Sequence, residues 1–281
     1  EWRPPENRQT ERRRIVAGDL HINSADQPIF QRWTESVRVF VIALEPPFIE
    51  QVVGDVLVSA FNSAGQRCSA LRLLFVQDDL ATRLLGMLAG AMEELVVGDP
   101  GLIETDVGPL IDEEAQAGLS HHAETLGRIG KPIHECRLPD SCAHGTFFAP
   151  RAFEIDDPGL LTREVFGPIL HVVRFASDRL DRVIEQINAS GYGLTLGIHS
   201  RIDATVEHIL RRVRVGNVYV NRNMIGAVVG VQPFGGEGLS GTGPKAGGPH
   251  YLHRFALERT LAIDITAQGG NATLLSLAED N

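Results

Sequence analysis

The sequence predicts an α/β domain built on an open, largely parallel sheet. From about residue 50 onward, segments with apolar residues at helical spacing alternate with short apolar runs typical of buried strands. Glycine and proline separate these segments. Strands that alternate with helices of about ten residues or more are typical of βαβ units.

The elements are expected in the following order. The segment 50–62 (EQVVGDVLVSAFN) has helical spacing, and 69–77 (SALRLLFVQ) then predicts a strand. Further helices are expected at 79–95, 112–129, 178–189 and 203–214. Further strands are expected at 145–156, 168–175, 194–199 and 216–221. A glycine-rich stretch at 230–249 precedes one last strand, ERTLAIDI, which begins at residue 258.

The first 48 residues differ from this pattern. They contain Pro4-Pro5, a charged run and Pro46-Pro47, and only 37–44 (VRVFVIAL) has the pattern of a buried strand. We therefore expect a divergent lead segment at 1–48, a folded body at 49–265 and a loose tail at 266–281.

Composition excludes several classes of protein. The net charge of −10 disfavours a nucleic-acid partner, so the cluster Arg12–Arg14 is interpreted as a solvated tail. No run approaches the ~20 apolar residues of a membrane span, and no signal peptide is evident. Three cysteines without disulfide-scaffold density favour a reducing, cytoplasmic location.

Cys68, within FNSAGQRCSALR, is a candidate nucleophile. A thiol attacks only as thiolate, so it needs a positive field, a helix terminus or a base. Arg67 is adjacent, and the small residues around the turn leave room for a substrate carbonyl. Taken alone, a cysteine where a helix meets a strand is more often structural, so both interpretations stand at this point.

Two further motifs favour simple structural interpretations. Gly236 to Gly241 (GEGLSG) matches G-x-G-x-x-G, but no helix can follow it in GTGPKAGGP, so we reject a dinucleotide fingerprint. A second motif, H-x-C-x5-C-x-H, consists of His134, Cys136, Cys142 and His144. Structural zinc sites prefer shorter spacings between cysteines, so a hairpin is favoured and no metal site is predicted.

Glu164-Val165-Phe166-Gly167-Pro168 precedes a predicted strand. Its carboxylate is suited to bind a ribose hydroxyl while the ring packs on a planar cofactor. The simpler interpretation is a turn with one buried phenylalanine.

Together these stretches resemble the catalytic domain of the aldehyde dehydrogenase superfamily. The resemblance is carried, in matching order, by GQRC (65–68), EVFGP (164–168) and PFGG (233–236) with Ser240-Gly241. A narrower resemblance links SAGQRCSALR, NMIGAVVGVQPFGG, GTGPKAGGPHYL and ITAQGGNATLL to one module of bifunctional proline-utilisation enzymes. That module is an L-glutamate γ-semialdehyde dehydrogenase, and those enzymes carry a proline dehydrogenase domain upstream.

The resemblance implies a mechanism and a set of ligands. Cys68 would attack a small-molecule aldehyde, hydride would pass to NAD+, and water would hydrolyse the thioester. Glu164 would hold the nicotinamide ribose and Phe166 would wall the nicotinamide. The backbone of Gly226 and Ala227 would hold the substrate's α-carboxylate, assisted by Ser69 next to the nucleophile. Homo-oligomers are also implied.

The sequence departs from the family before Cys68. The family's dinucleotide-binding domain should lie there, but 67 residues precede Cys68 and they show no match to it, so we expect that domain to be largely missing. Glu35 lies near the position of the family's general base but lacks the expected glycines. Two hypotheses follow: an incomplete NAD-dependent dehydrogenase module, or a fragment without redox activity that acts in interaction or oligomerisation. An acyl-phosphate reductase is disfavoured by Gly226-Ala227 and the GGNA tail.

Overall fold

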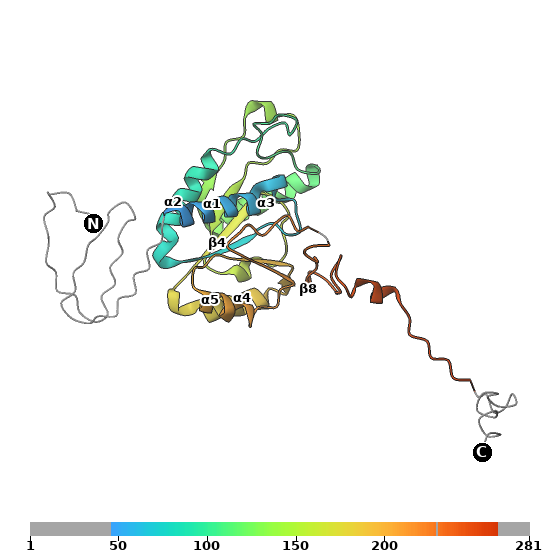
Figure 1. Ribbon diagram of the computed structural model, residues 1–281. Coiled ribbons are helices and arrows are strands. Elements are labelled where there is room, and N and C mark those ends of the chain that lie inside the picture. Colours follow the sequence, from blue (N-terminus) through green and yellow to red (C-terminus); the bar gives the residue numbers. More distant parts are fainter. Residues whose placement is uncertain (1–45, 229, 264–281) are drawn as a thin grey trace, which may run out of the picture.

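The computed structural model describes residues 46–228 and 230–263. The predicted strand at 37–44, the Arg12–Arg14 cluster, Glu35 and the tail at 266–281 lie outside the described residues. Within them the fold is α/β, with a mixed, parallel-rich sheet as predicted (Figure 1).

The central sheet has the strand order β1-β4-β3-β2. Strands β1, β4 and β3 are parallel, and β2 pairs antiparallel with β3. The bounds are β1 Leu73–Gln77, β2 Lys131–Glu135, β3 Arg151–Glu154 and β4 Ile169–Phe175. The first five residues of β4 are buried, as expected for a strand covered on both faces.

Two strands begin several residues later than predicted, and strand β2 and the two-residue strands Tyr192–Gly193 and Glu237–Gly238 were not predicted. The strand expected at 145–156 begins at Arg151, because Pro150 has no N–H to donate to a ladder. The strand expected at 69–77 begins at Leu73, because the chain first turns around Cys68. Strand β2 was not predicted, since Gly130 and Pro132 indicate a turn; it lies at the sheet's edge, where proline is tolerated.

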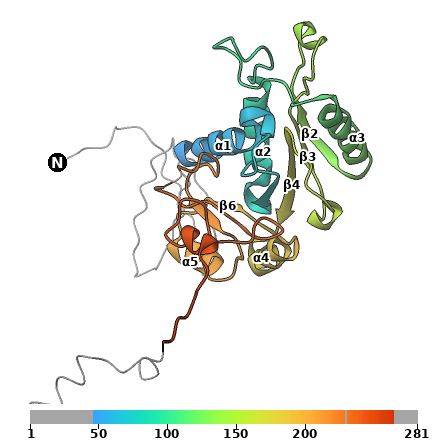
Figure 2. The ribbon, with the colours of Figure 1, turned by 90° about the vertical axis from the view of Figure 1, so that its right-hand side faces the viewer.

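Helices cover this sheet on both sides (Figure 2). Helices α1 (Pro46–Phe61) and α2 (Asp78–Glu93) lie on one side and α3 (Glu113–Ile129) on the other. The carboxylate of Asp112 caps α3 by accepting a 2.8 Å hydrogen bond from the Ala115 N–H. The core between these layers contains fully buried side chains from each, including Phe61, Leu88, Leu126 and Leu170.

A second, smaller unit follows. Strands β6 (Thr195–Ile198) and β7 (Asn217–Val220) are parallel, and α4 (Leu180–Ala189) and α5 (Asp203–Leu210) accompany them (Figure 2). The two-residue strands β5 (Tyr192–Gly193) and β8 (Glu237–Gly238) pair antiparallel. Short 3₁₀ helices occupy Asn62–Gly65, Asp140–Cys142, Pro158–Leu160, Ser177–Arg179 and Tyr251–Phe255. None of the described helices is long and apolar enough to cross a membrane.

The strand expected from residue 258 is not formed in its described part. Residues 256–263 are exposed, belong to no strand and lead away from the body (Figure 1). A strand requires a neighbour for its backbone groups, and none of the described strands lies beside this segment.

Candidate active site

Cys68 lies in a turn that follows α1, and its side chain is exposed. The three residues Ser63, Ala64 and Gly65 have φ angles of 57°, 54° and 62°, all left-handed. This conformation is unfavourable for residues with a Cβ and persists where the surrounding structure enforces it, often at functional sites. The chain therefore reverses sharply and presents the thiol to solvent.

Gly65 brings the Cys68 turn against the turn at 164–168. A Cβ added at Gly65 would lie 2.4 Å from the carbonyl oxygen of Gly167 and 2.9 Å from that of Ala60. Only glycine permits this approach of two backbones. Two motifs that are about a hundred residues apart in the chain are thus in direct contact.

Arg72 binds both turns, and sequence reasoning missed it. Its guanidinium donates 2.8 Å and 3.3 Å hydrogen bonds to the carbonyl oxygens of Gly167 and Arg67. Its Nε lies 3.7 Å from Glu164 Oε1, and its Cζ lies 4.9 Å from the centre of the Phe166 ring. Burial lowers the pKa of Arg72, an effect partly offset by the charges of Glu164 and Cys68.

Glu164 and Phe166, the predicted cofactor residues, lie beside this arginine and remain accessible. The Glu164 side chain is 41% exposed, and Phe166 is 43% exposed. A carboxylate that is only loosely paired keeps acceptor sites for hydroxyl groups, and an exposed ring face offers a surface for a planar group. The structure thus brings Cys68, Glu164 and Phe166 together around one guanidinium.

Ser69 is buried, and its backbone helps to hold the Cys68 turn in place. Its carbonyl accepts a 3.3 Å hydrogen bond from the Thr195 hydroxyl of β6. Ser59 of α1 makes a second link: its carbonyl accepts from the Leu71 N–H at 2.9 Å, and its hydroxyl accepts from the Met224 N–H at 3.1 Å. Ser59, which is also buried, therefore joins the nucleophile turn to the 222–228 loop.

Gly226 and Ala227, the predicted substrate-binding residues, follow Met224 in this loop. Gly226 has φ +77°, a conformation that suits glycine, and a Cβ there would meet no atom within 4 Å. Its backbone is therefore open to a ligand. The structure ties this loop to α1 through Ser59 but gives no direct contact between Gly226 and Cys68.

Gln66 fixes the turn on its other side. Its side-chain NH2 donates to the Pro109 carbonyl at 3.2 Å, and its side-chain oxygen accepts from the Ile111 N–H at 2.8 Å. Gln66, two residues before Cys68, thus holds the turn against the 109–111 loop.

A histidine pair lies under the site. His171 of β4 contacts the Arg72 carbonyl through Nδ1 at 2.7 Å and His122 through Nε2 at 2.8 Å. Burial lowers the pKa of His171 to about 4, and it also lowers the pKa of His122. Both rings are thus neutral near pH 7. His171 contacts the carbonyl of Arg72, the residue that binds both turns, and His122 in turn contacts His171.

The H-x-C-x5-C-x-H residues are dispersed. The Cys136 thiol donates to the Met92 carbonyl at 3.2 Å, and the Cys142 thiol contacts the Val97 carbonyl at 3.7 Å. His134 instead faces Glu93 at 3.3 Å. Across residues 46–228 and 230–263, no group of three or more His, Cys, Asp or Glu side chains is arranged to hold a metal.

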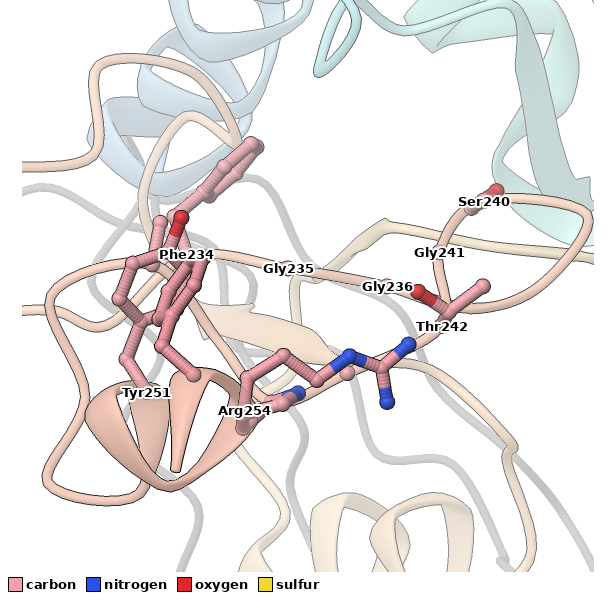
Figure 3. A pocket seen from close by; sticks show the side chains of 12 residues that line it. Phe234, Gly235, Gly236, Ser240, Gly241, Thr242, Tyr251 and Arg254 are labelled. Carbon is pink, nitrogen blue, oxygen red and sulfur yellow. The ribbon is translucent and has the colours of Figure 1, made fainter. Parts of the chain in front are cut away.

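The glycine-rich stretch forms a hollow of about 330 Å³ (Figure 3). Phe234 and Tyr251 lie near each other, and Arg254 extends toward Thr242. Gly236–Gly241 contributes β8 and a turn, and no α-helix follows it in the described residues, as the sequence predicts.

Comparison with known proteins places these features in a family. A model of the aldehyde dehydrogenase family matches residues 40–261. The bifunctional protein PutA of Escherichia coli is 56% identical over 227 residues, which are 78% of this chain and 17% of that protein. The chain thus spans about a sixth of that relative's length.

Solved structures agree. A proline utilization A (PutA) mutant from Bradyrhizobium japonicum is 58% identical, with a TM-score of 0.73, over 79% of this chain and 22% of that one. A 1-pyrroline-5-carboxylate dehydrogenase from Thermus with bound NAD is 34% identical, with a TM-score of 0.68, over 74% of this chain and 40% of that one. This chain covers only part of the relatives' fold, and the family model's match, residues 40–261, includes every site residue described above. The chain belongs to the aldehyde dehydrogenase family.

Proposed function

We propose that this chain carries the nucleophile, the nicotinamide-side contacts and the substrate loop of a site that oxidises L-glutamate γ-semialdehyde to L-glutamate with NAD+. The observation that carries the proposal is the contact of two turns, in which Gly65 packs on Gly167 and Arg72 binds both. This contact gathers an exposed thiol, a carboxylate and an aromatic ring in one place. The relatives named PutA and 1-pyrroline-5-carboxylate dehydrogenase support the choice of substrate.

The residues present fit the nicotinamide half of NAD+. Glu164 has free acceptor sites for ribose hydroxyls, and Phe166 offers an exposed ring face to a planar ring. When bound, NAD+ would supply the hydride acceptor. A relative of known structure contains NAD.

Cys68 performs the covalent chemistry. Its thiolate sulfur attacks the aldehyde carbon, and the carbonyl oxygen takes a proton, giving a thiohemiacetal. Conversion to the thioester would require that this carbon give up a hydride, which bound NAD+ would accept, and that the hydroxyl give up its proton. Water then cleaves the C–S bond, releasing the carboxylate product and restoring the thiol. The 222–228 loop would orient the substrate by donating the N–H groups of Gly226 and Ala227 to its α-carboxylate.

The test follows the thioester directly. The purified chain is mixed with L-glutamate γ-semialdehyde and NAD+, and intact-mass spectrometry is used to detect a glutamyl adduct on Cys68. Cys68→Ala is the control for the nucleophile, and Glu164→Gln is the control for the cofactor contact. We expect an adduct that needs both Cys68 and NAD+. Absence of any adduct, together with Cys68 alkylation that does not respond to NAD+, would refute the proposal for this chain.

One observation favours a second function, as an interaction or oligomerisation module. Residues 256–263 are exposed along their whole length and include three large apolar side chains, Leu257, Leu261 and Ile263. Such a segment offers unpaired backbone and apolar surface to a second copy. Light scattering of the wild type and of a Leu257→Ser, Leu261→Ser variant tests this. A wild type that is monomeric at all concentrations would exclude it.

A further inference from the structure

One side of helix α1 carries three polar side chains spaced by four residues, Gln51, Asp55 and Ser59. The first two contact the smaller unit. The Gln51 side chain donates a 3.0 Å hydrogen bond to the Asn221 carbonyl, and Asp55 Oδ2 lies 3.0 Å from His199 Nε2. Gln51 is exposed, Asp55 is partly buried and Ser59 is buried, so the row leads inward toward the end of α1 that precedes the nucleophile turn.

Ser59 contacts both parts of the proposed site. Its carbonyl accepts a 2.9 Å hydrogen bond from the Leu71 N–H, just after the nucleophile turn, and its hydroxyl accepts a 3.1 Å hydrogen bond from the Met224 N–H. Ser59 is 3% exposed and Met224 is 8% exposed. Because a buried N–H without an acceptor is unfavourable, this hydroxyl fixes where the Met224 backbone lies.

The loop around Met224 is braced by Arg222. The Arg222 guanidinium donates 3.0 Å and 3.3 Å hydrogen bonds to the carbonyls of Asn223 and Ile225, the two residues that flank Met224. The backbone from 222 to 225 is therefore held together as one piece, and Gly226 follows it directly. A hydrogen bond that fixes Met224 thus also fixes where Gly226 lies relative to α1.

We propose that Ser59 is a positioning residue that sets specificity for ligands bearing an α-carboxylate. Its hydroxyl aligns the backbone of Gly226 and Ala227 with Cys68, so that a ligand held by its α-carboxylate presents its other end to the thiol. Ser59 acts through the loop rather than on the ligand. This inference rests on the proposed function, which assigns the substrate's α-carboxylate to the 222–228 loop.

Two ligands that differ by one carboxylate test this role in the purified chain. L-glutamate is the proposed product, and γ-aminobutyrate is the same molecule without the α-carboxylate. Each is titrated against the rate at which iodoacetamide alkylates Cys68, measured by peptide mass spectrometry. In the wild type, we expect L-glutamate to slow alkylation at concentrations about tenfold or more below those that γ-aminobutyrate requires, because it makes additional charge-assisted hydrogen bonds.

Ser59→Ala should raise the concentration of L-glutamate needed for half-protection by about tenfold and leave that of γ-aminobutyrate unchanged. It should also speed amide hydrogen exchange in peptides covering 222–228. Ser59→Thr keeps a hydroxyl, so its values should lie between those of the wild type and Ser59→Ala. Ser120→Ala is the matched control, because the Ser120 hydroxyl donates to the Gln116 carbonyl within α3 and the same change there should affect neither ligand.

The outcomes separate this inference from the proposed function. Absence of protection by L-glutamate in the wild type would refute the proposed substrate site and, with it, the role of Ser59. Protection in the wild type that Ser59→Ala leaves unchanged would overturn the role of Ser59 alone. Equal weakening of both ligands would indicate a general loss of structure and overturn that role too, as would exchange at 222–228 that matches the wild type.

Discussion

The contact between Gly65 and Gly167 makes a quantitative prediction for Gly65→Ala. The substitution places a Cβ 2.4 Å from one backbone oxygen and 2.9 Å from another, and neither can rotate away. It also forces alanine into φ +62°. The left-handed conformation costs about 1–2 kcal/mol, and overpacking costs about 1–3 kcal/mol. We expect the free energy of unfolding to fall by about 2–5 kcal/mol.

Gly54→Ala is the matched control. Gly54 is exposed on α1, has no positive φ, and an added Cβ there would meet nothing within 4 Å. Alanine in a helix interior is favoured over glycine by about 1 kcal/mol, so this variant should be slightly stabilised. The same chemical change thus has opposite effects at two positions on either side of the end of α1.

Urea unfolding followed by far-ultraviolet circular dichroism is the suitable assay. Circular dichroism reports on the helices described here, whereas both tryptophans, Trp2 and Trp33, lie outside the described residues. Gly65→Asn separates the two contributions, because asparagine tolerates the left-handed region but keeps the Cβ contact. The reasoning is wrong if Gly65→Ala unfolds at the same urea concentration as Gly54→Ala.

Three further predictions concern the groups around the site. In the native chain, iodoacetamide should label the exposed Cys68 and leave the buried Cys136 and Cys142 unlabelled until urea unfolds the protein. Peptide mass spectrometry measures this, and labelling of all three in the native chain would contradict their burial. Arg72→Gln removes the guanidinium that donates to the Gly167 and Arg67 carbonyls, so the free energy of unfolding should fall by about 1–3 kcal/mol, with Arg72→Lys intermediate. Equal urea midpoints would refute this role. Burial lowers the pKa of His171 from 6.5 to about 4. As pH falls through this range, the unfolded chain binds a proton that the folded chain does not. The free energy of unfolding should therefore drop by up to about 3 kcal/mol between pH 6.5 and 4. Urea titrations should show a smaller drop for His171→Asn, and equal drops would exclude His171 as the cause.

Local patterns were enough to predict most of the elements. The helices around α1, α2 and α3 and the strands β4, β6 and β7 follow from periodicity and from glycine or proline at their ends. Strand β2 was missed because Pro132 suggests a turn, and only the finished sheet shows that it lies at an edge. The pair β5–β8 joins residues some 45 positions apart, and no local pattern announces it.

The site was predicted as a set of residues but not as an arrangement. Cys68, Glu164 and Phe166 were identified from motifs, whereas Arg72, the last residue of FNSAGQRCSALR, was given no role. Its role depends on the Gly167 carbonyl, 95 residues away in the chain. The histidine pair is equally non-local, since His122 and His171 meet only because α3 packs near β4. Contacts of this kind follow from packing and cannot be derived from spacing.

The two halves of the site differ in what holds them. The nucleophile turn, Glu164 and Phe166 belong to the larger unit and are joined there by Gly65 and Arg72. The 222–228 loop belongs to the smaller unit and reaches the turn through Ser59, while Thr195 of β6 reaches the Ser69 carbonyl. Further links are the 3.0 Å hydrogen bond from the Gln51 side chain to the Asn221 carbonyl and the 3.0 Å contact of His199 with Asp55. A neutral hydrogen bond of this kind contributes about 1 kcal/mol. The contacts proposed for NAD+ are therefore held within one unit, whereas the alignment of the proposed substrate loop with Cys68 depends on the few polar links between the two units.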